Sequence, residues 1–259
     1  EFTGETTEAR GGKGNAVLMS WDHSREATIS LEDALLSAES LRAMLSNSAF
    51  EGDYNKTGGE GFSAPKSIVM PRIKRISGDE ILKLKAVVLY ILKKCRTIDN
   101  FHLFKILYFA DREHYAVYGR RLVNDTFCAL KNGPVPSFLY DAIKVLYGGT
   151  AGEELQIISS ALSVADSDYK YFISAVEDPD MDELSVSDVE MLDKSISENL
   201  TLSFDTLSLK SPDIAWREAW EKTPNSPIVP ILMARAAGAS DATIEYIKEN
   251  EFFDTLAEA

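Results

Sequence analysis

The chain has 259 residues, of which 45% are hydrophobic, and a formal net charge of -14. These totals favour a globular protein with a substantial core over a disordered or fibrous one. No apolar run reaches the roughly 18 to 20 residues of a membrane span, and no charged-then-apolar leader opens the chain, so we expect a cytoplasmic protein without membrane contact.

The two cysteines, Cys95 and Cys128, lack CxxC spacing, and the chain has only three histidines. This set does not form a recognisable metal site, and no phosphate-binding glycine loop or nucleophile motif is present. We therefore expect free thiols, no metal and no cofactor.

The net charge is unevenly distributed along the chain. Residues 1–65 carry 5 basic and 11 acidic side chains, for a net of -6, whereas residues 66–149 carry 15 and 7, for a net of +8. Residues 150–259 carry 7 and 23, for a net of -16. Such blocks bear on partners and on electrostatic steering rather than on fold.

The first part of the chain, residues 1–69, is predicted to be a flexible extension or linker. Residues 1–28 are rich in Gly, Thr, Glu and Ser and cannot bury enough surface to offset their ordering entropy. Residues 30–46 differ, because leucines and alanines recur there at helical spacing behind the N-cap candidate Ser30, so one amphipathic helix is expected.

A single domain is predicted over residues 70–259. After a helix start at Ser77, residues 81–95 show a largely apolar helix with basic polar positions, and its last-turn lysines suit the carbonyl end of a helix. Phe101 to Tyr118 forms a central helix that is apolar over most of its circumference, which is typical of a helix inside a core. Gly119 is its C-cap candidate.

The central helix has a few polar positions. His102, Lys105 and Arg112 fall on one stripe, while Asp111 falls among aromatic residues. A carboxylate in such surroundings must find a partner or stay protonated, so we expect an ion pair of Asp111 with Arg112 or Lys105. The histidines His102 and His114 are about three turns apart, too far for one metal or one proton relay.

The remaining elements alternate between short helices and a small β element. The segment 122–130 is expected to be extended, the bend at 132–136 precedes a helix to Tyr147, and strands at 155–160 and 169–176 form a hairpin or wing. Five further helices are predicted, at 185–198, 204–207, 214–220, 231–237 and 241–257. Trp216 and Trp220, at i and i+4, are expected to be core anchors. The predicted fold is thus mainly α: a compact multi-helix domain with a small β-hairpin or wing, preceded by a flexible N-terminal extension.

The run LFKILYFADREHYAVYGR, followed by DTFCALKNGPVPSFLYD, resembles the Panacea domain, also called the SocA-like antitoxin domain. The later segments PDMDELSVSDVEMLD, ENLTLSFDTL, AWREAW and GASDATIEYIKEN are similar to the tail of that family, so the resemblance covers residues 83–250. It implies an antitoxin that neutralises a toxin by direct protein contact, and one founding member is a protease adaptor. The matching signature positions, expected to be mostly scaffold, are Lys105, Tyr108, Asp111, Arg112, Gly119, Arg120, Gly133, Pro134, Val135, Pro136, Tyr140 and Trp216.

The sequence leaves several functions open. The first is an antitoxin bound to a cognate toxin, which the acidic charge suggests is basic and RNA-directed. The alternatives are a nucleic-acid-binding autoregulator of its own operon using the +8 segment, a protease adaptor for the toxin and, last, an enzyme. Many relatives carry Ser-His-Asp where this chain has Ser211-Pro212-Asp213, which argues against catalysis there because proline transfers no proton.

Overall fold

The computed structural model describes residues 7–11, 16–21, 27–29, 75–149, 152–164 and 172–257 of the chain. The chain divides into two compact units, residues 1–47 and residues 48–259.

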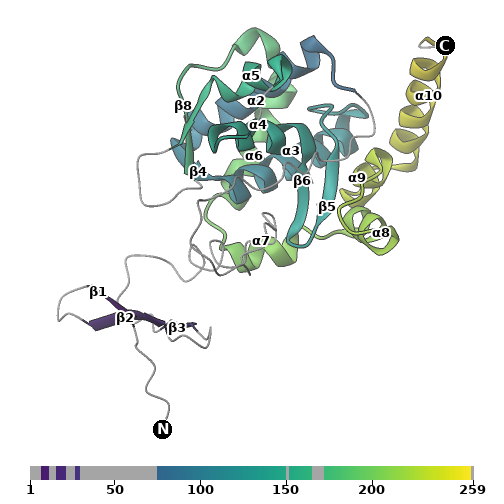
Figure 1. Cartoon of the computed structure of the whole chain (residues 1–259). Helices are drawn as coiled ribbons and strands as arrows, with labels where there is room; N and C mark the ends of the chain where they lie inside the picture. Colours follow the sequence, from purple (N-terminus) through teal and green to yellow (C-terminus); the bar gives the residue numbers. More distant parts are fainter. Residues whose placement is uncertain are drawn as a thin grey trace. The chain divides into compact units, whose positions relative to one another are not determined.

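The first unit contains a three-stranded antiparallel sheet in the order β1-β2-β3 (Figure 1). Its strands are β1 (Thr7–Gly11), β2 (Ala16–Trp21) and β3 (Ala27–Ile29). These strands were not predicted, because the Gly-, Thr- and Glu-rich composition hides the short runs that pair. The helix expected at 30–46 and the expected boundary at 69/70 lie outside the described residues.

The second unit is mainly α-helical with two small β elements, which confirms the predicted fold class. Nine α-helices fall within its described residues. Its elements are α2 (Gly78–Cys95), β4 (Thr97–Asp99), α3 (Asn100–Tyr118), β5 (Phe127–Leu130), β6 (Gly133–Pro136), α4 (Ser137–Leu146), α5 (Glu153–Ser159), β7 (Leu162–Val164), β8 (Phe172–Ala175), the 3-10 turn η1 (Met181–Glu183), α6 (Val186–Asn199), α7 (Phe204–Lys210), α8 (Ile214–Lys222), α9 (Pro230–Ala236) and α10 (Asp241–Ala257).

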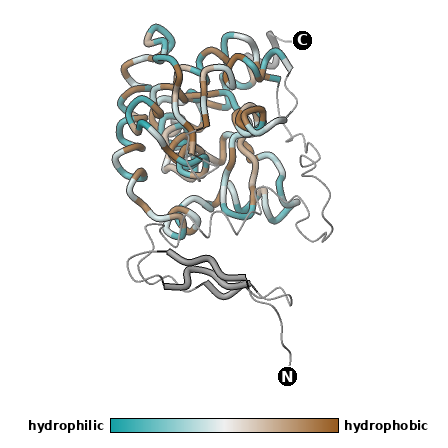
Figure 2. The backbone as a smooth tube through the Cα atoms, turned by 60° about the vertical axis from the view of Figure 1, so that its left-hand side comes forward, coloured by the Kyte–Doolittle hydropathy of each residue, from teal (hydrophilic) through white to brown (hydrophobic). Residues whose placement is uncertain are grey.

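Helix α3 lies at the centre of this unit and contacts α2, α6, α7, α9, α10 and β6. The side chain of Asp99 caps its first turn by accepting from the His102 backbone N-H at 3.0 Å. Gly119 ends it in a left-handed conformation at φ 65°, the C-cap expected from the sequence. Most α3 side chains are buried, and in Figure 2 hydrophobic positions gather within the helical body.

The antiparallel hairpin β5-β6 leads from α3 into α4, with Phe127 paired to Pro136 and Leu130 to Gly133. The first turn of α4 is capped from a distance, because its own N-cap residue Pro136 has no side-chain hydrogen bond to offer. The buried carboxylate of Asp125 accepts from the backbone N-H groups of Phe138 at 2.9 Å and Leu139 at 3.0 Å. A polar group ten or more residues upstream thus satisfies donors that a local N-cap usually satisfies.

A second small sheet has the antiparallel order β4-β8-β7. The strand predicted near 169–176 is confirmed as β8, but the strand predicted at 155–160 is wrong, because residues 153–159 form helix α5. Gly152 is the N-cap of this helix. Glu153 and Glu154 occupy its first turn, where acidic side chains interact favourably with the helix dipole. The strand that pairs with β8 lies just after it, at Leu162–Val164.

The C-terminal half follows the predicted helices. Helix α6 begins with a capping box, with Ser185 accepting from the Asp188 N-H and Asp188 accepting from the Ser185 N-H. Trp216 and Trp220 stack with ring centroids 5.2 Å apart and pack, partly buried, against the main core. Trp216 Nε1 also donates to the Leu130 carbonyl at 2.8 Å, which ties α8 to the hairpin.

Candidate functional site: the polar groups of helix α3

The ammonium group of Lys105 is fully buried and donates one hydrogen bond, to the Pro134 carbonyl at 2.9 Å. Burial holds the pKa of Lys105 well below its ordinary value, since no anionic partner among the described residues favours the charged form. Gly133, at φ 100°, allows this close approach: a Cβ there would lie 2.9 Å from Lys105 Nζ and 2.2 Å from Ser211 Oγ. Lys105 therefore joins α3 to strand β6 of the hairpin.

One turn further along α3, Tyr108 and Arg112 converge on Asp213. The Tyr108 hydroxyl and Arg112 NH1 each donate to Asp213 Oδ2 at 2.7 Å. The other carboxylate oxygen of Asp213 caps α8 by accepting from the Trp216 N-H at 3.1 Å. Burial and the Asp213 carboxylate raise the pKa of Tyr108 well above its usual range, so it acts here as a donor.

Asp111 is fully buried, and its partner is Arg121 rather than Arg112 or Lys105. Arg121 Nε donates to Asp111 Oδ2 at 2.7 Å, while Oδ1 accepts from the backbone N-H groups of Leu122 at 2.8 Å and Val123 at 3.2 Å. The predicted pairing was wrong because the chain turns back after Gly119 and brings Arg121 beside the helix. Asp111 thereby fixes the segment that leaves α3.

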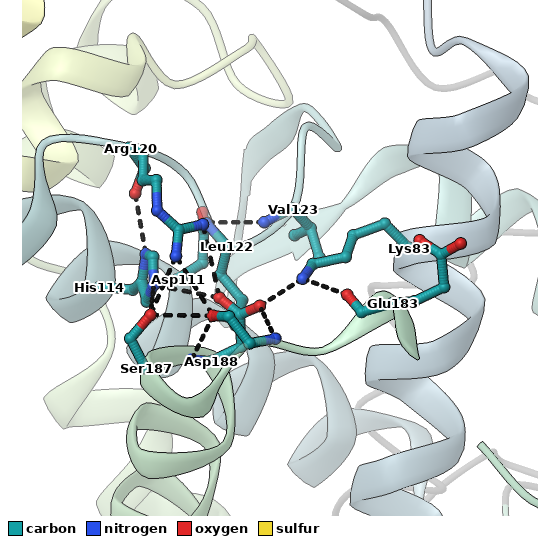
Figure 3. A network of polar contacts seen from close by, with 10 residues as sticks. Lys83, Asp111, His114, Arg120, Leu122, Val123, Glu183, Ser187 and Asp188 are labelled. Atoms are coloured by element: carbon teal, nitrogen blue, oxygen red, sulfur yellow. Dashed lines mark hydrogen bonds and ion pairs between the residues drawn. The ribbon is translucent and has the colours of Figure 1, made fainter. Parts of the chain in front are cut away.

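A fourth polar cluster lies at the C-terminal end of α3 (Figure 3). His114 Nδ1 lies 2.9 Å from the Arg120 carbonyl, and Nε2 lies 3.1 Å from Asp188 Oδ1 and 3.3 Å from Ser187 Oγ. Asp188 Oδ1 also lies 3.6 Å from Arg120 NH1, and neither contact has hydrogen-bond geometry, so among the described residues this oxygen accepts no directed hydrogen bond. Lys83 from α2 donates to the other oxygen of Asp188 and to the Glu183 carbonyl.

The Asp188 carboxyl titrates far from its usual range. Burial alone would raise the pKa of Asp188, but the polar contacts that His114, Lys83 and Ser185 make with this carboxylate outweigh that effect and hold its pKa well below the usual value. This cluster joins α2, α3 and the first turn of α6 around one carboxylate.

The basic residues of α2 pair with acids of a single later segment, residues 177–193. Four lysines and four acids take part: Lys83 with Asp188, Lys85 with Glu177, Lys93 with Asp178, and Lys94 with Asp193. The opposite charges that the sequence separates into blocks are therefore brought together in the fold. Much of the positive charge considered for nucleic-acid binding faces the protein's own carboxylates.

Most of the other signature positions are also buried. Residues 133–136 form strand β6 and are buried, and the Tyr140 ring packs 6.2 Å from that of Phe104. Burial and the neighbouring Asp141 raise the pKa of Tyr140 to about 12. Arg120 is the exposed member, and its NH2 donates to Ser185 Oγ at 3.2 Å and Ser187 Oγ at 2.9 Å.

Among the residues that the structure describes, no group of three or more His, Cys, Asp or Glu side chains could hold a metal ion. His102 lies apart from His114 and interacts with Asp99 at 2.6 Å and with the Leu202 carbonyl at 2.8 Å. Cys128 is buried and Cys95 half-buried, both as free thiols. No helix in the described ranges is long and apolar enough to cross a membrane.

These features define a helical domain whose central helix carries buried polar groups bound by the protein's own segments. Residues 103–221 match the family model of the antitoxin SocA-like, Panacea domain, which confirms the resemblance seen in the sequence over that segment. Residues 1–56 match a second family, the YomU/Tube protein family, which was not recognised from the sequence. No curated protein and no solved structure matches the chain.

Proposed function

We propose that the protein is an antitoxin that neutralises a cognate protein toxin by direct binding. The observation that carries the proposal is the match of residues 103–221 to the antitoxin SocA-like, Panacea domain. The structure supports a binding role in a further respect. The polar groups that could have been assigned to chemistry, such as Lys105 and Asp111, are buried and bound to the protein's own groups.

We infer that the signature residues act mainly as scaffold and that the protein works without turnover. The buried groups at positions 105, 108, 111 and 112 connect α3 to the hairpin, to α8 and to the segment after Gly119. Removal of one partner from such a group leaves an uncompensated buried charge or donor. Toxin contact then comes from exposed surface rather than from these groups.

The partner that fits the charge of this chain is a basic, RNA-directed toxin. The net charge is -14, and residues 150–259 alone contribute -16. Opposite net charges raise the association rate of two proteins more than their affinity. The pairing of the α2 lysines with residues 177–193 disfavours the alternative of a nucleic-acid-binding autoregulator, because phosphate binding would have to displace those carboxylates.

Co-expression tests the proposal in cells. The product of the adjacent open reading frame is expressed with and without this protein, and growth is scored. The antitoxin assignment predicts arrested growth for the neighbour alone and restored growth for the pair. Growth that stays arrested in the presence of abundant, folded protein overturns the assignment.

A further inference from the structure

The apolar contacts of helix α10 are separate from the main core. Its buried side chains Ile244 and Ile247 pack with Tyr115 of α3 and Ala234 of α9 in a small cluster of their own. The other side chains of residues 241–252 are exposed or half-buried. In Figure 1 the helix lies at the edge of the unit, beside α9. A satellite cluster of this kind attaches an element to a domain without making it part of the contiguous core.

Two further contacts hold α10 against the end of α3. The Tyr246 ring lies over Gly119, because a Cβ added at Gly119 would be 2.5 Å from Tyr246 Cδ1 and 3.8 Å from Ile247 Cγ1. The Tyr115 hydroxyl donates to the Glu251 carboxylate at 3.2 Å. The buried surface that α10 covers is called the acceptor strip below, and it consists of Tyr115, Gly119 and Ala234.

Helix α10 is also stabilised by contacts within its own segment. Ser240 Oγ accepts from the Thr243 N-H at 3.1 Å, and the Ser240 carbonyl accepts from the Ile244 N-H at 2.9 Å. Lys248 and Glu245 form an ion pair along the helix at 2.7 Å. None of these contacts involves the acceptor strip, so separation of the helix from the strip leaves its cap and its ion pair in place.

A short connection between α9 and α10 can act as the hinge. Gly238 is exposed and has φ 84°, a conformation that glycine adopts without strain. A Cβ added at Gly238 would meet no described atom within 4 Å beyond its chain neighbours. A change of backbone dihedral angles there therefore breaks few contacts, which is typical of the residues that absorb hinge motions.

We propose that α10 is a latch that opens at Gly238 while the rest of the domain stays folded, and that the uncovered acceptor strip binds an amphipathic helix of a partner protein. Helix α10 itself defines the chemistry of this ligand: two isoleucines three residues apart and a carboxylate for the Tyr115 hydroxyl. Such a helix binds in the place of α10, as apolar faces of helices do in grooves. Segments with few buried apolar contacts open at a lower free energy than the core. The latch does not depend on the antitoxin function.

Hydrogen exchange of the full chain tests the opening. In wild type, the protection factors of α10 amides should be at least about tenfold lower than those of the slowest α3 amides. Ile247→Ala should lower the protection of α10 at least about tenfold further and leave that of α3 within about twofold. The control is Ile91→Ala on α2, because Ile91 is as buried as Ile247 but lies in the main core. It should lower the protection of α3 and leave that of α10 within about twofold.

A labelled peptide of residues 240–257, added to the full chain, tests the acceptor strip. The protein's own α10 competes with the peptide, so the apparent affinity is reduced by the fraction of protein that is open. Ile247→Ala in the protein should therefore tighten peptide binding by the same factor by which it lowers the protection of α10. The control peptide carries Ile244→Ala and Ile247→Ala and should bind at least about tenfold more weakly.

Equal protection of α10 and α3 in wild type overturns the latch, as does an equal loss in both helices on Ile247→Ala. A peptide that binds wild type and Ile247→Ala equally well, or that binds neither protein, overturns the acceptor strip as a helix-binding site. Neither measurement involves the toxin, so both failures leave the antitoxin assignment standing.

Discussion

Two regions of helix α3 differ in how they use their side chains. Along most of its length the polar groups point inward, and Asp111 is bound by Arg121 and two backbone N-H groups. In its last turn, Val117 and Tyr118 are exposed. On the proposed function, the signature positions maintain the architecture and the partner contacts exposed surface. Substitutions in the two regions should have different consequences.

The largest expected effect is on folding, from Asp111→Ala. This change leaves Arg121 and two backbone donors without their carboxylate, so we expect the free energy of unfolding to fall by about 3 to 5 kcal/mol. Urea unfolding measures it. Glu190→Ala, at an exposed acid of α6, is the control and should change stability by less than about 0.5 kcal/mol. A loss of under about 1 kcal/mol for Asp111→Ala would contradict its structural role.

Tyr108→Phe, also in the buried part of α3, should have a smaller effect on stability than Asp111→Ala. It removes the hydroxyl that donates to Asp213 but keeps the ring in the core. A hydrogen bond to a charged group contributes about 1.5 to 3 kcal/mol, and we expect a loss in that range. Thermal and urea unfolding provide the measurement. Val135→Ala would lose only packing, so it separates cavity effects from loss of the hydroxyl.

How far these features follow from the sequence depends on the range of the interaction. Local signals were sufficient for the helix starts at Ser77 and Ser185 and for the C-cap at Gly119, because a few neighbouring residues determine each. The pairing of Asp111 with Arg121 was missed because it depends on how the chain turns after α3. The acidic partners of the α2 lysines lie more than 80 residues away, which no local pattern reveals.

The misassigned strand has a local cause. Residues 155–160 contain Leu155, Ile157 and Ile158, and a short apolar run of this kind fits either a strand or one buried side of a helix. Contacts with α2 and α4 select the helix, and the actual strand β7 is only three residues long. The signature residues were recognisable from the sequence as a group, but their individual partners required the fold.

The pH dependence of stability sharpens the account of Lys105. Its folded pKa is lowered, so between that value and the ordinary lysine value of about 10.4 the unfolded chain binds more protons than the folded one. Stability from this group therefore rises with pH across that window. Lys105→Met should flatten this rise on the acidic side of the ordinary lysine pKa in urea unfolding. A slope equal to that of wild type would show that Lys105 is charged in the folded protein.

The smallest expected effect is at the surface of α2. The Lys85 ammonium pairs with Glu177, and the exposed fractions of the two side chains are 24% and 47%. An ion pair of this kind contributes at most about 1 kcal/mol, so Lys85→Gln should lower the free energy of unfolding by less than that. High salt should reduce the difference further. A larger loss would mean that the pairing of α2 with residues 177–193 is a main determinant of the fold.

The most direct test of the antitoxin account is complex formation between the purified wild-type protein and the purified product of the adjacent open reading frame. Titration calorimetry and light scattering after size exclusion would measure it. The account predicts a saturable complex of the two proteins alone, whose association slows as salt is added. Absence of a complex, in conditions where co-expression still rescues growth, would contradict neutralisation by direct binding.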